Sequence, residues 1–212
     1  KGSLFVSFDL SVIPNKNIIV AVTGGIAAYK SAILVRRLKD AGFNIRVVMT
    51  KGAQAFVTPL TFQALSGNSV HTELLNPEAE AGMGHIELAR WADLILVAPA
   101  SCDTLAKFAA GLADDLLSTL YLATKAPVWV APAMNQQMWA AKATQRNLNT
   151  LVEDGVHVIM PDAGAQACGD VGLGRMPEPE DLAYQVIKYF HQAQRTIAEK
   201  FGQLAGKHVV IT

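Results

Sequence analysis

The sequence predicts an α/β protein in which helices cover both faces of a parallel sheet, giving three layers. From Ile18 onward, apolar and β-branched runs alternate with segments of helical periodicity, as in chains built from strand–helix–strand crossovers. Each apolar run is nearly uninterrupted, which is typical of strands buried on both faces. The 212 residues are enough for one domain of this kind.

Five strands and four helices are expected along the chain. The strands span residues 18–23, 45–50, 94–98, 128–131 and 156–160. The first helix is expected at 27–41, because Ile33, Leu34 and Leu38 share one face and Gly42 follows as a stop signal. Further helices are expected at 105–123, 145–154 and 180–200.

Residues 162–176 break this alternation. They contain four glycines and almost no large apolar side chains, so we expect a long loop of the kind often used as a lid. A strand that opens at His208 and stops at the last residue would be an unpaired edge, which predicts the start of a truncated second domain at 204–212. The main domain is then 17–203, and residues 1–16 are an N-terminal extension without the features of a signal peptide.

The composition excludes several classes of partner. Lys+Arg 18 balance Asp+Glu 18, so nucleic acid is not an expected partner. No apolar run approaches the roughly 20 residues of a spanning helix, so no membrane partner is expected. Two cysteines without metal-ligand spacing to histidines predict neither a disulfide scaffold nor a metal site, and fit a reducing cytoplasm. An apolar content of 51% predicts a buried subunit interface.

Ligands of open parallel sheets bind beyond the carboxyl ends of the strands. The first strand ends in TGGIAA, where Gly24 and Gly25 let the backbone approach a ligand and Ile26 follows. The dinucleotide pattern GxGxxG is absent, and the second strand ends at Thr50 without an acidic residue for a ribose. A mononucleotide therefore fits better than a dinucleotide; the alternative is that the glycines only shape a tight turn.

The third strand runs into the segment Ser101, Cys102, Asp103 and Thr104, which opens a helix. Hydroxyls and helix amides together make a phosphate site that needs no lysine or arginine. Ordinary helix capping by Ser101 or Asp103 is the alternative interpretation.

Three further positions are candidates for chemistry. Asn135 follows the fourth strand and can hold a carboxylate with a neutral amide, although it could also cap the next helix, and Met138 could simply fill the core. His85 follows a glycine-rich stretch and titrates near neutrality. Cys168 lies in the glycine-rich segment, where packing does not explain a cysteine, so it is a candidate proton donor, nucleophile or redox group.

Five segments together resemble the flavin-containing cysteine decarboxylases, and within them the members acting on 4'-phospho-N-pantothenoylcysteine. These segments are TGGIAAYK, APASCDTLAK, PAMNQQMW, ACGDVGLGRM and GHIELARW, the last of which contains His85. The resemblance covers residues 17 to about 200. It implies a Rossmann/flavodoxin-like three-layer fold with a substrate lid. It also implies that residues 204–212 begin a fused phosphopantothenate–cysteine ligase, and that the subunits form homo-oligomers, as trimers or dodecamers.

The resemblance implies FMN as cofactor and a role for each matching residue. The cofactor-binding set would be Gly24, Gly25, Ile26, Thr50, Ser101, Cys102, Asp103, Thr104 and Ala133. The substrate-binding set would be Asn135, Met138, Ala167 and Gly169, with Asn135 on the carboxylate. His85 and Cys168 would be the catalytic pair.

The activity implied is decarboxylation to 4'-phosphopantetheine and CO2 in coenzyme A biosynthesis. In this family the substrate thiol is first oxidised by the flavin to a thioaldehyde, which accepts the electrons left by departing CO2; the enethiolate is then reduced, with Cys168 as proton donor. Alternatives are a flavin prenyltransferase, which lacks the PAMNQQMW and ACGDVGLGRM pairing, and a non-catalytic regulatory subunit, which would lack His85, Asn135 or Cys168.

Overall fold

A five-stranded parallel sheet forms the centre of the computed structural model. The structure describes residues 15–74, 84–167 and 169–204, and side chains are described up to residue 193. The strand order is β2-β1-β3-β4-β5. The strands are β1 (Asn17–Val22), β2 (Asn44–Met49), β3 (Leu94–Ala100), β4 (Val128–Pro132) and β5 (His157–Val158). All five predicted strands are therefore confirmed, and the order reverses between β1 and β3, where such sheets bind ligands.

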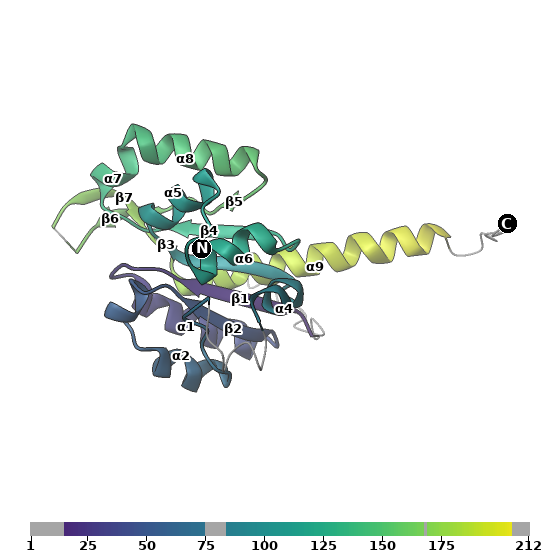
Figure 1. Cartoon of the computed structure of the whole chain (residues 1–212). Coiled ribbons are helices and arrows are strands. Elements are labelled where there is room, and N and C mark those ends of the chain that lie inside the picture. The colour runs from purple at the N-terminus through teal and green to yellow at the C-terminus, as the bar shows by residue number, and fades with distance from the viewer. Residues whose placement is uncertain (1–14, 75–83, 168, 205–212) are drawn as a thin grey trace, which may run out of the picture.

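Helices cover both faces of the sheet (Figure 1), which confirms the three-layer prediction. On one face lie α1 (Ala28–Asp40), α2 (Pro59–Ser66) and α9 (Pro179–Leu204). On the other lie α4 (His85–Trp91), α5 (Cys102–Ala110), α6 (Leu116–Ala123) and α8 (Lys142–Glu153). The short helices η1 (Ala53–Ala55) and α7 (Gln136–Ala140) follow β2 and β4.

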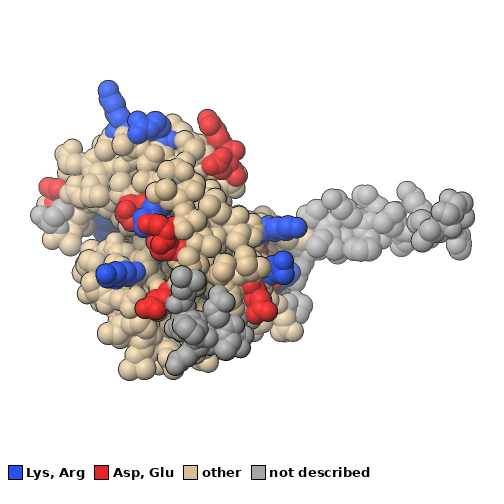
Figure 2. Space-filling model, viewed as in Figure 1, with Lys and Arg blue, Asp and Glu red and all other residues tan. Residues whose placement is uncertain are grey.

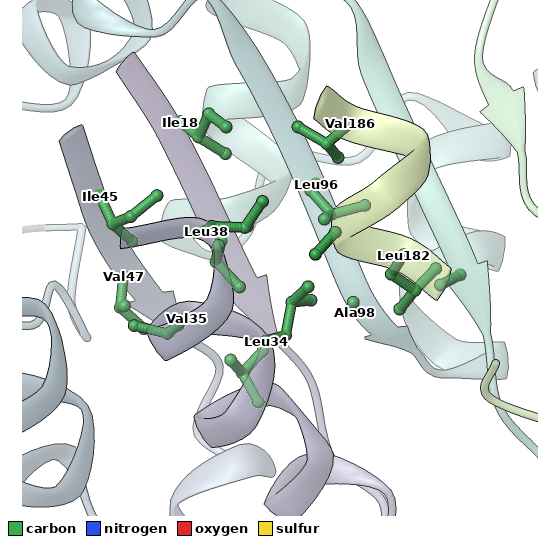
Figure 3. Close-up of a cluster of buried hydrophobic side chains, with 14 of the residues drawn as sticks. Ile18, Leu34, Val35, Leu38, Ile45, Val47, Leu96, Ala98, Leu182 and Val186 are labelled. Atoms are coloured by element: carbon green, nitrogen blue, oxygen red, sulfur yellow. The ribbon is translucent and has the colours of Figure 1, made fainter. Parts of the chain in front are cut away.

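Alternate residues of each strand supply the two halves of the core. Ile18 of β1 joins the cluster formed with α1 and α9 (Figure 3). Val20 belongs to the same cluster, whereas Ile19 packs on the opposite face. Leu34 and Leu38 of α1 are fully buried, and each such leucine contributes about 1.5–3 kcal/mol to folding. The apolar strand pattern thus fixes the sheet that positions the site.

The predicted helix at 105–123 is two helices. Gly111 ends α5 in the left-handed conformation, with φ 66°, and Asp115 begins α6 by accepting a hydrogen bond from the backbone N–H of Ser118. The sequence prediction missed α2, whose start is marked by Pro59 at its first position. The helices predicted at 27–41, 145–154 and 180–200 are confirmed within a few residues.

The prediction of a loop at 162–176 is wrong. Strands β6 (Asp162–Ala165) and β7 (Val171–Arg175) form an antiparallel hairpin, which projects from the body of the domain (Figure 1). Gly174 has φ 134°, and a Cβ at this glycine would collide with the carbonyl oxygen of Met134. The glycines that suggested irregular structure instead let a strand lie directly on another backbone.

Charged side chains of both signs are interspersed on the face seen in Figure 2, without a broad patch of one sign on its described residues. None of the described helices combines the length and the apolar character needed to cross a membrane. Most of the predicted extension at 1–16 and all but one residue of the predicted ligase start at 204–212 lie outside the described residues.

Candidate active site

A cavity of about 480 Å³ opens at the carboxyl edge of the sheet, between the ends of β1, β3 and β4 and the β6–β7 hairpin. This volume is within the range of small-molecule sites. The predicted site residues that line it are Gly24, Gly25, Ile26, Ser101, Cys102, Ala133, Asn135, Met138 and Ala167. Residues predicted from separate strand ends therefore meet at one place.

The turn after β1 forms one wall. A Cβ on Gly24 would lie 3.1 Å from the carbonyl carbon of Gly52, so this glycine permits a close backbone approach. A Cβ on Gly25 would meet no protein atom within 4 Å and would occupy space in the cavity instead. Ile26 lies beside it with 63% of its surface exposed. The glycine pair is therefore more than a tight turn, because it keeps a wall of the cavity open.

Thr50 supports this wall from behind. Its Oγ1 accepts a hydrogen bond of 3.3 Å from the backbone N–H of Ala53, at the start of the turn that carries Gly52. Thr50 is not one of the described residues that line the cavity. Its predicted contact with a ligand stays a prediction.

The start of α5 forms a second wall. Ser101 Oγ accepts a hydrogen bond of 3.2 Å from the backbone N–H of Thr104, so this serine caps the helix. Thr23 Oγ1 accepts a hydrogen bond of 2.8 Å from the backbone N–H of Ser101, which joins the ends of β1 and β3. The side chain of Asp103 is 77% exposed and faces Lys107, outside the cavity. Of the predicted phosphate segment, Ser101 and Cys102 reach the cavity.

The segment after β4 forms the third wall. Asn135 Oδ1 accepts a hydrogen bond of 2.8 Å from the backbone N–H of Gln137, which confirms the alternative role in capping α7. Asn135 Nδ2 also donates a hydrogen bond of 2.8 Å to Asp170 Oδ2 of the hairpin. The amide of Asn135 therefore caps a helix and holds a carboxylate at the same time.

The hairpin is fastened over this third wall by polar contacts. The backbone N–H of Met134 donates to the carbonyl of Gly174 at 2.9 Å. Gln166 Oε1 accepts from the backbone N–H of Gln136 at 3.0 Å, and its Nε2 donates to the carbonyl of Met134 at 3.3 Å. Gln166 was not predicted as a site residue, because a single glutamine in a glycine-rich segment gives no sequence signal of a tertiary role.

A buried lysine was also missed. Lys30 is 7% exposed; its Nζ donates to the carbonyl of Met176 at 3.1 Å and to Glu178 Oε1 at 2.7 Å. A buried ammonium needs such partners because removing it from water is costly. Lys30 therefore ties α1 to the segment after the hairpin.

The predicted catalytic pair is only partly located. His85 begins α4, on the side of the sheet covered by α5, α6 and α8, and within the described part of the chain it does not line the cavity. Cys168 lies outside the described residues, between Ala167, which lines the cavity, and Gly169, which does not. Gly169 has φ 89° and its N–H donates to the carbonyl of Gln166, so it shapes the hairpin turn.

Known proteins are similar to this chain in sequence. The flavoprotein family profile matches residues 10–191, more than half of the chain. The chain belongs to the flavoprotein family. This flavoprotein is 55% identical over 179 residues to the coenzyme A biosynthesis bifunctional protein CoaBC of Haemophilus influenzae, covering 84% of this chain and 45% of that protein. It thus spans less than half the length of that relative.

Solved structures also resemble the flavoprotein. A variant of a PPC decarboxylase, complexed with pantothenoylaminoethenethiol, has a TM-score of 0.74 and 33% identity, covering 84% of this chain and 100% of that chain. The FMN-dependent cysteine decarboxylase SpaF has a TM-score of 0.69 and 31% identity, covering 82% and 96%. The fold and the family predicted from the sequence motifs are therefore confirmed.

Proposed function

We propose that this flavoprotein binds FMN in the cavity and decarboxylates 4'-phospho-N-pantothenoylcysteine to 4'-phosphopantetheine and CO2, a step of coenzyme A biosynthesis. The observation that carries the proposal is the convergence of the Gly24–Gly25 turn, the start of α5 and the Asn135 segment on one cavity beneath the hairpin. The identity to CoaBC and the likeness to a PPC decarboxylase support it.

The cavity has the features that FMN requires. The open face of Gly25 would let a flat ring approach the backbone, and the exposed Ile26 and Ala133 would offer it apolar contact. The start of α5 would hold the phosphate through helix amides and the Ser101 hydroxyl. When bound, FMN would take up the electrons removed from the substrate's cysteine side chain and return them after CO2 has left.

The contact between Asn135 and Asp170 indicates how the substrate carboxylate is held. Asn135 Nδ2 already binds one carboxylate oxygen at 2.8 Å, so a substrate carboxylate replacing Asp170 would find a donor in place. A neutral amide does not add a positive charge that would stabilise the carboxylate against leaving as CO2. Met138, 47% exposed in the same wall, would contact the neighbouring carbon atoms.

The remaining steps are assigned to the hairpin and the catalytic pair. The hairpin, with Ala167 and Gly169 near its turn, would act as the lid that excludes water. Cys168 would donate the proton that completes the final reduction, and His85 would position or deprotonate the substrate. In the overall reaction the carboxylate leaves as CO2 and a proton takes its place.

We propose a homo-oligomer, a trimer or an assembly of trimers, because one subunit leaves the site incomplete. His85 lies apart from the cavity, while large apolar side chains are exposed beside the cavity and on α2: Ile26 63%, Tyr29 55%, Leu60 71%. A neighbouring copy would cover this surface and supply its His85. We also place the enzyme in the cytoplasm, with 17–203 as the decarboxylase domain and a fused ligase domain in the full-length protein.

Two variants test the chemistry on the purified flavin-loaded protein. We expect Cys168→Ser to retain flavin and release CO2, but to yield a product two hydrogens lighter than 4'-phosphopantetheine; full turnover to the normal product would rule out the assigned role. We expect His85→Asn to retain flavin and release almost no CO2. Mixing both variants in one oligomer should restore normal product if a neighbour supplies His85, and light scattering gives the oligomeric state.

A further inference from the structure

The cavity carries an excess of positive charge. Among the described residues that line it, the charged ones are Lys30 and Arg175, and both are cationic. The protein as a whole has no net charge, so this local excess does not reflect the overall composition. A cavity lined by cations favours an anionic ligand group wherever neighbouring carboxylates leave part of that positive charge uncompensated.

The two cations are used differently. Lys30 is buried and donates to Met176 and Glu178, so its ammonium is already paired within the protein. Arg175 Nη2 lies 3.7 Å from the same Glu178 oxygen, which is too far for a hydrogen bond, and 40% of its side chain is exposed. One carboxylate therefore faces two cations, and the guanidinium of Arg175 is the group with positive charge left for a ligand.

The hairpin is built to accommodate this guanidinium. Arg175 ends β7, and a Cβ on Gly164 of the opposite strand would lie 2.6 Å from Arg175 Nη1. With φ 153°, Gly164 has a backbone conformation that L side chains rarely adopt. The arginine therefore lies across the hairpin at the end away from the turn, where it also lines the cavity.

The spacing along the hairpin matches the length of the proposed substrate. Asp170, whose carboxylate is bound to Asn135, precedes β7 and Arg175 ends it, so the backbone between these two residues spans about 17 Å along the strand. In the substrate, about twelve covalent bonds separate the carboxyl carbon from the phosphorus, equivalent to about four extended residues or about 14 Å. An arginine side chain easily covers the difference.

We propose that Arg175 binds the terminal phosphate of the substrate and gives the enzyme its preference for the phosphorylated compound; this inference rests on the proposed function. A guanidinium matches phosphate with two parallel N–H donors, whereas the FMN phosphate is assigned to the start of α5. The substrate would thus be held at both ends, with Asn135 at its carboxylate and Arg175 of the hairpin at its phosphate.

The test compares kcat/KM for 4'-phospho-N-pantothenoylcysteine and for N-pantothenoylcysteine, which lacks the phosphate. In Arg175→Ala we expect kcat/KM for the phosphorylated substrate to fall about 10- to 100-fold, mainly through KM. We expect kcat/KM for the unphosphorylated compound to change less than about threefold. Arg175→Lys should recover part of the preference. Arg36→Ala, an exposed arginine on α1 outside the cavity, is the matched control and should behave as the wild type.

Several results would overturn the inference. An equal loss on both substrates would mean a structural role, and loss of bound flavin would mean that Arg175 serves the cofactor. If the wild type releases no CO2 from either compound, the proposed function fails. Calorimetry then measures the binding affinity for 4'-phosphopantothenate and for pantothenate, which tests the inference without turnover. The inference holds if the wild type binds the phosphorylated compound more tightly and Arg175→Ala does not, and it is wrong otherwise.

Discussion

Replacing Gly174 with alanine tests whether backbone contact between the hairpin and the Met134 segment maintains the site. The added Cβ would collide with the carbonyl oxygen of Met134, and alanine would have to adopt φ 134°. Strain of this kind costs about 1–3 kcal/mol before the collision is counted. Four hydrogen bonds fasten the hairpin to this wall, counting the one from Asn135 to Asp170, and together they supply about 4 kcal/mol at a typical net value of 1 kcal/mol each.

Because strain and collision together exceed what these bonds supply, we expect the Gly174→Ala hairpin to detach while the domain stays folded. The global unfolding free energy should then fall by no more than about 4 kcal/mol, since detachment relieves the remaining strain. With the docked state in the minority, the apparent KM should rise at least about twofold, and about tenfold if a tenth of the molecules stay docked. Substrate kinetics and amide hydrogen exchange of residues 162–175 measure the two effects.

Gly155→Ala is the matched control. Gly155 also has a left-handed backbone, with φ 87°, but no atom lies within 4 Å of its added Cβ, and it is remote from the cavity. We expect a loss of about 1 kcal/mol in global stability and an unchanged KM. A Gly174→Ala protein with wild-type KM and wild-type exchange protection of the hairpin would show that the contact with Met134 does not maintain the site.

Two further variants test other parts of the molecule. Gly25→Val should abolish flavin binding with little change in melting temperature of the apoprotein, because its side chain would enter the cavity and meet no protein atom; the flavin absorbance per subunit measures this. Partial burial raises the pKa of Asp115, but hydrogen bonds from Ser118 and the charge of Lys107 outweigh it, so the net pKa is lowered. Stability from Asp115 is therefore present above the unfolded pKa of about 4 and is lost as pH falls through the folded value, so urea unfolding of wild type and Asp115→Asn should converge in acid.

The sheet was predictable because its residues are buried on both faces. Continuous apolar runs such as 94–98 favour strands buried on both faces, and the carboxyl ends of parallel strands meet at one edge. That geometry is why Gly24, Ser101 and Asn135, which are far apart in sequence, were predicted to share a site. The break at Gly111 was harder to predict, since a single glycine can be tolerated within a helix.

The hairpin and the cations of the cavity could not be predicted, because their contacts are not marked by a regular apolar pattern in the sequence. The strands β6 and β7 pack on backbone and polar groups, so they lack the apolar alternation by which strands are recognised. Lys30 sits on an amphipathic helix, where a lysine is usually solvated, and its partner Glu178 is 148 residues away. Such pairs come together only in the folded chain, so no local sequence pattern predicts them.

The way the hairpin is held has a consequence for turnover. Its contacts with the Met134 segment are hydrogen bonds, which exchange with water on opening and so contribute only about 1 kcal/mol each in net terms. A docking free energy of about 4 kcal/mol, from four such bonds, leaves the open state populated at the level of about 0.1%. In the proposed role of the hairpin as a lid, that population would let substrate enter and product leave, while the closed state would dominate during the reaction. An apolar interface of the same extent would hold the hairpin closed more firmly, which explains why a glycine-rich, polar segment covers this site.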